Sequence, residues 1–498
     1  MHTRRNTKYL MIAATAALLI APFGLRTASA DLTTTFDPNS FATDISYNAA
    51  ASFADTGVGG TGPLAFDPNN PDTLFIVNRA ASTPTGGGGA FPFSISTQHR
   101  ISNTAGPIFL GSTLLGITWT SVSEPYDAVV GNDGSLYLEF VGTAAVYKVA
   151  NPLSDTPAVT KILGNYNLSG DDDPQGLFRM PASFGAAGYT SNDLIVLDDG
   201  LDANNVNAVV AVHADGSDGT APKIIWKSPG ATPSTTSIHG AVDPNSGFVY
   251  FISTATQQTS IDGTNYVYLS RVKGDGILQT IGLKLPTGVT LANSDDPIAV
   301  NPVDGSVWLA ESITLNGSTT ARNMLRVDTN YLTATSDSNT FLANTTLEFT
   351  ATTGFNLGVN SLTFTNDGKE LYAGTPDGTD KIYVFNTLIH NPGDANGDGV
   401  VNADDYALID RGFAADLTGF TNGDFNSDGV IDMNDYLIID TAYLQTHPMD
   451  PSLLAERSAQ FGDSYVSSLL ASVPEPSSAL LLLASFPLIQ RRKRNALS

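Results

Sequence analysis

Between residues 31 and 388 the chain repeats one pattern of apolar and polar positions. Each copy has an alternating apolar stretch, a turn of Pro, Asn, Asp or Gly, and a second apolar stretch that holds an aromatic residue. The copies lie at Leu64–Val77, Asp127–Leu138, Gly240–Phe251, Ile298–Leu309 and Leu362–Ala373, with a looser one at Gly176–Leu197. Alternation with a period of two predicts β-strands, and the turn residues predict that the strands pair as hairpins.

The copies recur roughly every sixty residues, which leaves room for four short strands in each. Repeats of this size predict a mostly β fold, a six-bladed or seven-bladed β-propeller over residues 31–388. Leu32–Phe53 is a candidate for a strand that closes the ring. With endings such as Val146–Val149 and Leu325–Asp328, the repeat resembles the NHL, lactonase-like and SMP-type propeller superfamily. A pair of β-sandwiches is the alternative architecture.

Composition and charge narrow the chemistry. The chain has no cysteine, which excludes a disulfide scaffold and a thiolate metal site. It has 24 Lys and Arg residues against 49 Asp and Glu residues, a net charge of −25. Such a surface repels nucleic acid and anionic membranes and attracts divalent cations, so no nucleic-acid partner is expected.

The first thirty residues have the pattern of a secretory signal peptide. Arg4, Arg5 and Lys8 precede the apolar run Tyr9–Ala21, and Ala28-Ser29-Ala30 supplies small residues for cleavage. A basic flank, an apolar centre and an A-x-A end are the three parts of such a signal. Residues 1–30 are therefore expected to direct export and to be removed after Ala30; a buried N-terminal helix is the alternative.

The last residues, 473–498, combine three elements in order. Pro474-Glu475-Pro476 leads into the uncharged stretch Ala479–Ile489, which is followed by the basic cluster Arg491–Arg494. This order resembles the PEP-CTERM sorting signal of exopolysaccharide-producing Gram-negative bacteria. The resemblance implies a transient inner-membrane tether, release by an exosortase-type sorting protease, and a final place at the cell surface or in the extracellular matrix. A simple C-terminal membrane anchor is the alternative.

Ahead of that tail the stretch Asp394–Asp405 returns as Asp424–Asp435, an internal duplication. Each copy has oxygen side chains at positions 1, 3, 5, 9 and 12, with glycine at position 6 and a backbone carbonyl available at position 7. Such a set of oxygen atoms can surround one Ca²⁺ ion. Each copy runs into an apolar helical segment, Tyr406–Phe413 or Tyr436–Leu444. A pair of Asx-rich turns without ions is the alternative.

This arrangement resembles the duplicated F-hand motif of the type I dockerin and defines residues 391–446 as a small α-helical calcium module. The resemblance implies two Ca²⁺ ions. The implied ligands are Asp394, Asn396, Asp398, the carbonyl of Val400, Asn402 and Asp405 for one ion, and Asp424, Asn426, Asp428, the carbonyl of Val430, Asp432 and Asp435 for the other. Cellulosomal dockerins often carry Ser or Thr at positions 10 and 11.

Here those positions hold Ala403-Asp404 and Met433-Asn434, which argues against a cohesin partner. The following residues, 447–472, place Leu454, Phe461 and Tyr465 at helical spacing. This segment is expected to form either a helix lying on the calcium module or a helical stalk before the sorting signal.

Polar residues stand just before the first strand of successive propeller copies. They are Glu124, Asp173, His239, Asp296 and Asn360. If those strands line the central channel, these side chains meet at one mouth, an arrangement that suits a divalent metal or a sugar. In lactonase-like propellers a Glu, an Asn and an Asp bind Ca²⁺, a role that the resemblance gives to Glu124, Asn360 and Asp296. The alternative is that the Asp-Pro and Asp-Gly pairs only make turns.

The sequence predicts a secreted or envelope-associated calcium-binding protein, a binding or scaffold module in the extracellular polysaccharide matrix whose ligand is polysaccharide or protein. One alternative is an exported calcium-dependent propeller hydrolase acting on a lactone or glycan. Another is an adhesion module that recruits a cohesin-like partner. The chain has no G-x-S-x-G, P-loop or H-E-x-x-H motif, so an enzyme here would be a metal-dependent hydrolase at the propeller mouth.

Overall fold

The computed structural model describes most of the chain between Ile45 and Val473. The described ranges are 45–47, 51–54, 60–79, 94–110, 125–140, 145–154, 156–164, 174–198, 206–228, 239–252, 259–261, 264–285, 289–291, 297–315, 318–329, 332–335, 339–350, 361–374, 381–426 and 428–473. All of them belong to one compact unit, Thr34–Ser498. The predicted signal peptide and residues 474–498 of the predicted sorting signal lie outside them.

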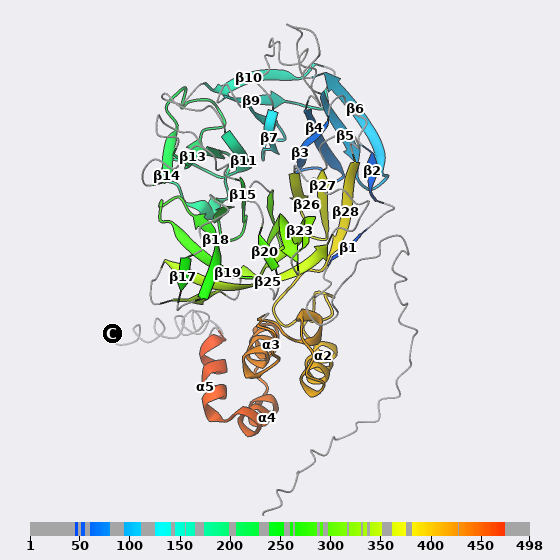
Figure 1. The fold of residues 1–498 in the computed structure, drawn as a ribbon, viewed down its shortest axis with the longest axis vertical. Helices are drawn as coiled ribbons and strands as arrows, with labels where there is room; N and C mark the ends of the chain where they lie inside the picture. The colour runs from blue at the N-terminus through cyan, green and yellow to red at the C-terminus, as the bar shows by residue number, and fades with distance from the viewer. Residues whose placement is uncertain are drawn as a thin grey trace, which may run out of the picture. The chain divides into compact units, whose positions relative to one another are not determined.

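The strands form six blades arranged around a common centre (Figure 1). Blades 1 to 3 contain β3 (Gly60–Phe66), β4 (Thr73–Arg79), β5 (Ser94–His99) and β6 (Thr104–Leu110); β7 (Pro125–Val130), β8 (Leu136–Phe140), β9 (Ala145–Ala150) and β10 (Ala158–Leu163); and β11 (Pro174–Arg179), η1 (Ala182–Phe184), β12 (Leu194–Asp198), β13 (Ala208–Val212) and β14 (Lys223–Lys227).

The other three blades carry extra short strands. Blade 4 contains β15 (His239–Val242), β16 (Val249–Ile252), β17 (Thr259–Ile261), β18 (Thr264–Val272) and β19 (Gln279–Lys284); blade 5 contains β20 (Val289–Leu291), β21 (Ile298–Val300), β22 (Val307–Leu315), β23 (Ser318–Val327), β24 (Thr333–Ala334) and β25 (Thr340–Thr350); blade 6 contains β26 (Ser361–Phe364), β27 (Glu370–Gly374) and β28 (Lys381–Thr387). Parallel pairing of β19 with β25 joins blades 4 and 5 at their outer edges.

The innermost strands close into a ring. β3 contacts β7, and the contacts continue through β11, β15, β21 and β26 back to β3. The predicted six-bladed propeller is thereby confirmed, and a pair of sandwiches, which has no such ring, is excluded. The described residues form no seventh blade.

The N-terminal residues complete the last blade. β1 (Ile45–Tyr47) and β2 (Phe53–Ala54) both pair antiparallel with β28. An ion pair of 2.9 Å between Arg100 of blade 1 and Glu370 of blade 6 connects the last blade to the first. Both short strands contain residues of the stretch Leu32–Phe53, in which a closing strand was expected.

Strands in the middle of a blade are buried on both faces because neighbouring blades cover them. In β12, Leu194 and Val196 face the core shared with blade 2, whereas Ile195 and Leu197 face the core shared with blade 4. Alternate side chains of a strand point to opposite faces, so one short run of apolar residues serves two cores.

A ring of hydrogen bonds joins the first turns of neighbouring blades, and we call it the interblade belt. In each turn an Asn or Ser side chain donates to a carbonyl oxygen of the next blade. The pairs are Asn69 Nδ2 to Asn132 O (3.2 Å), Asn132 Nδ2 to Ser191 O (2.7 Å), Ser183 Oγ to Pro244 O (3.3 Å), Asn245 Nδ2 to Pro302 O (2.8 Å), Asn301 Nδ2 to Gly368 O (3.0 Å) and Asn366 Nδ2 to Asp67 O (3.5 Å). The repeated turn residues therefore hold the ring together.

Residues 391–473 form a helical module. It contains α2 (Ala403–Ala414), η3 (Phe420–Asn422), α3 (Met433–Thr446), α4 (Pro451–Phe461) and α5 (Asp463–Ser472). One apolar core includes Ile409 of α2, Ile439 of α3 and Leu469 of α5. The segment 447–472, for which both a helix on the module and a stalk were considered, thus packs into the module's core.

A buried ion pair stabilises this packing. The guanidinium group of Arg457 in α4 donates to both carboxylate oxygens of Asp440 in α3, at 2.7 and 3.1 Å. The hydroxyl groups of Tyr406 and Tyr465 donate to the same carboxylate, each at 2.7 Å. The four side chains tie α2, α3, α4 and α5 together. None of the helices in the described ranges has the length and apolar character needed to cross a membrane.

Candidate functional sites: the duplicated loops and the propeller channel

The loop Asp394–Asp405 is organised around its first carboxylate. Asp394 is fully buried, and its Oδ1 and Oδ2 atoms accept the backbone N–H groups of Asp398 (3.1 Å) and Gly399 (2.8 Å). Gly399 has φ of +89°, a conformation that L side chains rarely adopt. The chain therefore turns sharply around Asp394.

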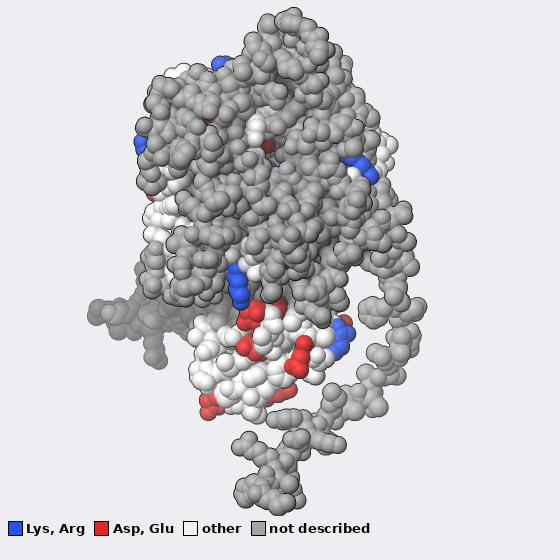
Figure 2. Space-filling model, viewed as in Figure 1, with Lys and Arg blue, Asp and Glu red and all other residues white. Residues whose placement is uncertain are grey.

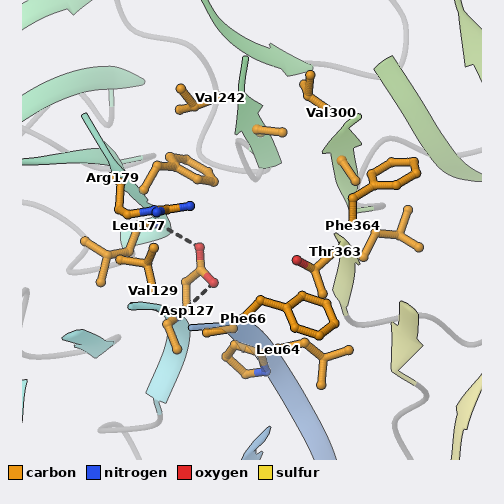
Figure 3. A pocket seen from close by; sticks show the side chains of 18 of the residues that line it. Leu64, Phe66, Asp127, Val129, Leu177, Arg179, Val242, Val300, Thr363 and Phe364 are labelled. Atoms are coloured by element: carbon orange, nitrogen blue, oxygen red, sulfur yellow. Dashed lines mark hydrogen bonds between the residues drawn. The ribbon is translucent and has the colours of Figure 1, made fainter. Parts of the chain in front are cut away.

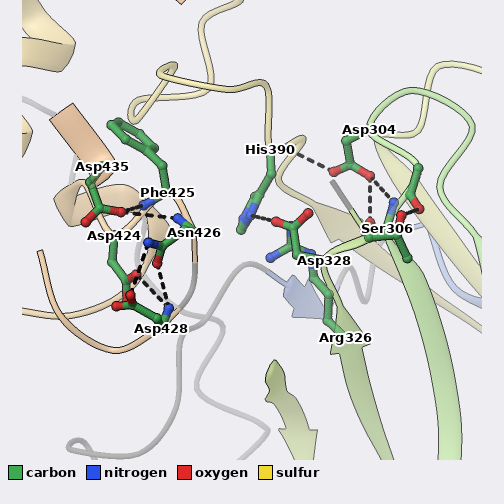
Figure 4. Close-up of polar contacts among 12 residues, drawn as sticks. Asp304, Ser306, Arg326, Asp328, His390, Asp424, Phe425, Asn426, Asp428 and Asp435 are labelled. Carbon is green, nitrogen blue, oxygen red and sulfur yellow. Dashed lines mark hydrogen bonds and ion pairs between the residues drawn. The ribbon is translucent and has the colours of Figure 1, made fainter. Parts of the chain in front are cut away.

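The loop Asp424–Asp435 repeats these contacts position by position (Figure 4). Asp424 accepts the backbone N–H groups of Asp428 and Gly429, both at 3.1 Å, and Gly429 has φ of +85°. In both loops the Asn at position 3 donates its amide to the Asp at position 5. The sequence duplication is thus also a structural duplication.

The last carboxylate of each loop connects it to the following helix. Asp405 Oδ2 accepts the N–H group of Asn402 at 2.9 Å, and Asp435 accepts that of Asp432 at the same distance. Asn402 and Asp432 in turn cap α2 and α3, so each helix begins with a capping box. The conformation of each loop is therefore coupled to the start of the helix that follows it.

Electrostatics make these loops suited to a cation. Burial, and then repulsion from Asp424 and Asp428, raises the pKa of Asp435 to about 7 despite its backbone hydrogen bonds. Burial likewise raises the pKa of Asp405 and Asp424. Figure 2 shows further acidic side chains on the visible face of the module.

The oxygen atoms that each loop offers as metal ligands fit Ca²⁺, which prefers about six to eight oxygen ligands and flexible geometry. Both loops offer only oxygen donors, and the backbone already bends around the first Asp of each. In the part of the chain that the structure describes, no three Asp, Glu, His or Cys side chains are gathered as a metal centre. The Asp oxygens instead accept backbone N–H groups.

Of the predicted mouth residues, the structure describes only His239. Glu124, Asp173, Asp296 and Asn360 lie outside the described residues, so their convergence remains a prediction. His239 is the first residue of β15, and its ring centroid lies 6.0 Å from that of Tyr126 in β7. These two rings lie beside the central channel of the propeller.

The channel is a cavity of about 450 Å³ enclosed by the inner strands (Figure 3). Apolar side chains such as Phe66, Val242 and Phe364 line much of it, and the hydroxyl group of Thr363 points into it. A cavity of this size that combines apolar walls with a few polar groups is typical of a small-molecule site.

Two charged residues beyond the five predicted mouth residues also line the channel: Asp127, which closes the sequence group that begins at Glu124, and Arg179, which sequence reasoning missed. Asp127 accepts the N–H groups of Ala128 and Leu177, both at 2.7 Å, and so connects blades 2 and 3. Arg179 is the last residue of β11, and burial lowers its pKa. Arg179 stands in the looser repeat copy, where only knowledge of which strand is innermost would reveal its position.

A second acid lies just behind the channel wall. Glu139 of β8 is the register partner of Asp127 and is fully buried. Burial, and then repulsion from Asp127 and Asp198, raises its pKa well above the usual range. The carboxyl group of Glu139 therefore keeps its proton to a higher pH than an exposed glutamate does.

His390 connects blade 5 to the region of the second loop (Figure 4). Its backbone N–H group donates to Asp304 at 2.9 Å, and its ring Nδ1 lies 3.8 Å from a carboxylate oxygen of Asp328. The imidazole ring stacks on Phe420 with centroids 3.7 Å apart, and Phe420 packs on Phe425 beside Asp424. One residue before the module thus contacts both domains.

No curated protein matches the chain in sequence. The chain is similar to the solved structures of a virginiamycin B lyase from Staphylococcus aureus (12% identity, 69% of this chain, 100% of that chain, TM-score 0.39) and a gluconolactonase from Xanthomonas campestris (12%, 71%, 96%, 0.36). It is also similar to a calcium-binding protein, regucalcin, from Agrobacterium tumefaciens (12%, 70%, 94%, 0.38). Similarities at this level say nothing about activity.

The helical module has a more specific match. Residues 392–445 match the dockerin type I domain, which is a calcium-binding module. The matched range contains both loops, α2 and nearly all of α3, whereas α4 and α5 follow it. The chain therefore joins a six-bladed β-propeller to a dockerin type I domain.

Proposed function

We propose that this chain is an exported calcium-binding protein that acts as a binding or scaffold module in extracellular polysaccharide. The propeller channel is its ligand site, and the dockerin domain is its calcium-dependent attachment site. The repetition of one hydrogen-bond pattern around Asp394 and Asp424 carries this proposal. Chance turns would not repeat a buried carboxylate, a left-handed glycine and a helix cap at the same positions.

Each loop holds one Ca²⁺ ion in this proposal. The first ion is bound by Asp394, Asn396, Asp398, Asn402, Asp405 and the Val400 carbonyl, and the second by the equivalent residues of the other loop. Bound calcium neutralises the clustered carboxylates. The residues themselves fix the starts of α2 and α3 through their capping boxes.

The partner of the dockerin domain is a protein or polysaccharide ligand. Dockerin domains typically bind cohesins, and an adhesion module that recruits a cohesin-like partner is the alternative. Ala403, Asp404, Met433 and Asn434 are exposed at the start of α2 and α3, where Ser and Thr are common in cellulosomal dockerins. These substitutions favour a different partner.

Calorimetric titration of the purified chain with Ca²⁺ tests the proposal. Two binding events are expected, of which Asp398→Ala removes one and Asp428→Ala the other. Glu456→Ala, which removes an exposed acid of α4, should leave both events unchanged. Absence of binding at millimolar Ca²⁺ would refute the calcium assignment.

Export is proposed from the two ends of the sequence. Arg4, Arg5 and Tyr9–Ala21 supply a signal peptide, and Pro474 to Arg494 supply a sorting signal cut by a protease at the inner membrane. Mass spectrometry of the released protein should show cleavage after Ala30 and near Pro474. Recovery of peptides that contain Leu480–Ile489 would contradict the processing.

The second candidate function is an exported hydrolase that uses the channel as its active site. The observation that favours it is the pair of ionisable rings, His239 and Tyr126, beside the cavity. A screen of lactones and glycans should then find turnover that His239→Asn abolishes. Absence of turnover would leave the scaffold proposal.

A further inference from the structure

Arg179 is the part of the channel that the proposed function leaves unexplained. It lines the cavity as the last residue of β11, opposite Leu194 in the ladder, and Figure 3 shows its side chain extending into the open space. Its guanidinium group makes no hydrogen bond and no ion pair with other residues of the described ranges. Within the described part of the chain, Arg179 is therefore a cation that faces a cavity without a partner.

None of the described acids lies at ion-pair distance from Arg179. Burial lowers its pKa, and the charge of Asp67 opposes that effect only in part. Asp127, which lines the channel, already accepts N–H groups with both oxygen atoms. A partly buried guanidinium is costly when unpaired, and its planar N–H donors match a carboxylate with two parallel hydrogen bonds.

The remaining lining indicates what carries the anionic group. Phe66 and Phe364 present apolar surface, and Thr363 presents a hydroxyl group. This mixture suits a ligand with apolar faces and several hydroxyl groups. Asp67 and Asp127 repel a doubly charged group more strongly than a singly charged one, which favours a carboxylate over a phosphate.

We propose that Arg179 binds the carboxylate of a sugar acid, such as a uronic acid, inside the propeller channel. This inference rests on the proposed function, which makes the channel the ligand site. It adds the class of ligand and the residue that selects it. Because Arg179 would be paired only when the ligand is bound, the same residue costs stability in the free protein.

Calorimetry on the chain without residues 1–30 tests the inference with D-glucuronate, D-glucose and inorganic phosphate. Glucuronate should bind on the order of tenfold more tightly than glucose, because it alone has a carboxylate. Arg179→Met should weaken glucuronate binding by a similar factor and leave glucose binding unchanged. Arg179→Lys, which keeps the charge but loses the planar group, should fall between.

A matched control is Lys161→Met, which removes an exposed positive charge of β10 outside the channel and should bind as the parent does. Without ligand, Arg179→Met should melt at or above the parent temperature; a clear fall would mean a structural role and overturn the inference. Equal binding of glucose and glucuronate, tighter binding of phosphate, or no binding at all would also overturn it. Calcium titration of the same sample shows separately whether the proposed function survives.

Discussion

The propeller turns and the dockerin loops are built from the same residue types, Asn, Asp and Gly, but they use them differently. In the interblade belt, neutral amides such as that of Asn245 donate to carbonyl groups of the next blade. In the loops, charged groups such as those of Asp394 and Asp424 accept backbone N–H groups of their own loop. The belt is complete without an ion, whereas the loops place several negative charges together.

This difference teaches that turn composition alone does not identify a metal site. In the interblade belt the Asn amide of a propeller turn is satisfied by the neighbouring blade, and the amide itself brings no charge. In the loops, by contrast, the raised pKa values of the carboxylates show that their charged forms are destabilised. The comparison predicts that the two regions respond to different perturbations.

The largest effect is expected from breaking the buried ion pair of the helical module. Arg457→Ala leaves the Asp440 carboxylate buried without its cation and should lower the module's unfolding free energy by about 3–5 kcal/mol. Differential scanning calorimetry should show this loss in the module's transition alone. Arg411→Ala, an exposed arginine of α2, is the control; an equal loss from both would contradict the assignment.

Calcium should come next. At a Ca²⁺ concentration of about one hundred times Kd, binding stabilises a site by about 2.7 kcal/mol, so EGTA should lower the module's melting temperature and leave the propeller's unchanged. The folded-state pKa of Asp435, about 7, lies above that of an unfolded Asp. Metal-free stability should therefore fall as the pH rises through 7, and Ca²⁺ should suppress that fall. If EGTA lowered the melting temperature of both transitions, the assignment of calcium to the helical module alone would be wrong.

The buried acid of the propeller offers a perturbation that calcium should not rescue. Because the pKa of Glu139 is raised in the folded state, its contribution is fully present below the pKa of an unfolded Glu and is lost as the pH rises. Glu139→Gln should raise the propeller's melting temperature at pH 8 and flatten its pH dependence. Glu456→Gln, an exposed acid, should do neither; a destabilised Glu139→Gln variant would contradict the burial argument.

The smallest effect is expected from the belt. Asn245→Ala removes one hydrogen bond to Pro302 and should cost about 0.5–1.5 kcal/mol in the propeller, independently of Ca²⁺. Chemical denaturation measures this difference. Asn192→Ala, in a turn of blade 3 but outside the belt, is the control and should change stability less.

The propeller architecture could be predicted because each blade contains a recognisable pattern within a short stretch of sequence. Runs such as Leu64–Val77 contain two strands and their turn within a few residues, so no distant contact is needed to recognise them. The loops could be predicted for the same reason, since all donors of one loop lie between Asp394 and Asp405. Both features depend on residues that are close in the sequence, and the structure keeps those residues close in space.

The channel residues could not be predicted in this way. The strand that contains Arg179 has the ordinary alternating pattern of a β-strand. Whether Arg179 faces a cavity depends on how the other five blades close around that strand. Glu139 is the one charged residue of β8, and the burial of every residue of that strand cannot be read from the sequence. The mouth hypothesis placed Glu124 and Asp296 at the channel, and both lie outside the described residues.

The pairing of β1 with β28 has a consequence for how the propeller folds. Ile45 and Thr387 are about 340 residues apart in the chain, so their contact closes a very long loop. Such a contact becomes affordable only after the intervening blades have brought the two ends near each other. The ring is therefore completed late in folding, and a chain that stops before Lys381 lacks the strand to which its own N-terminal segment must pair.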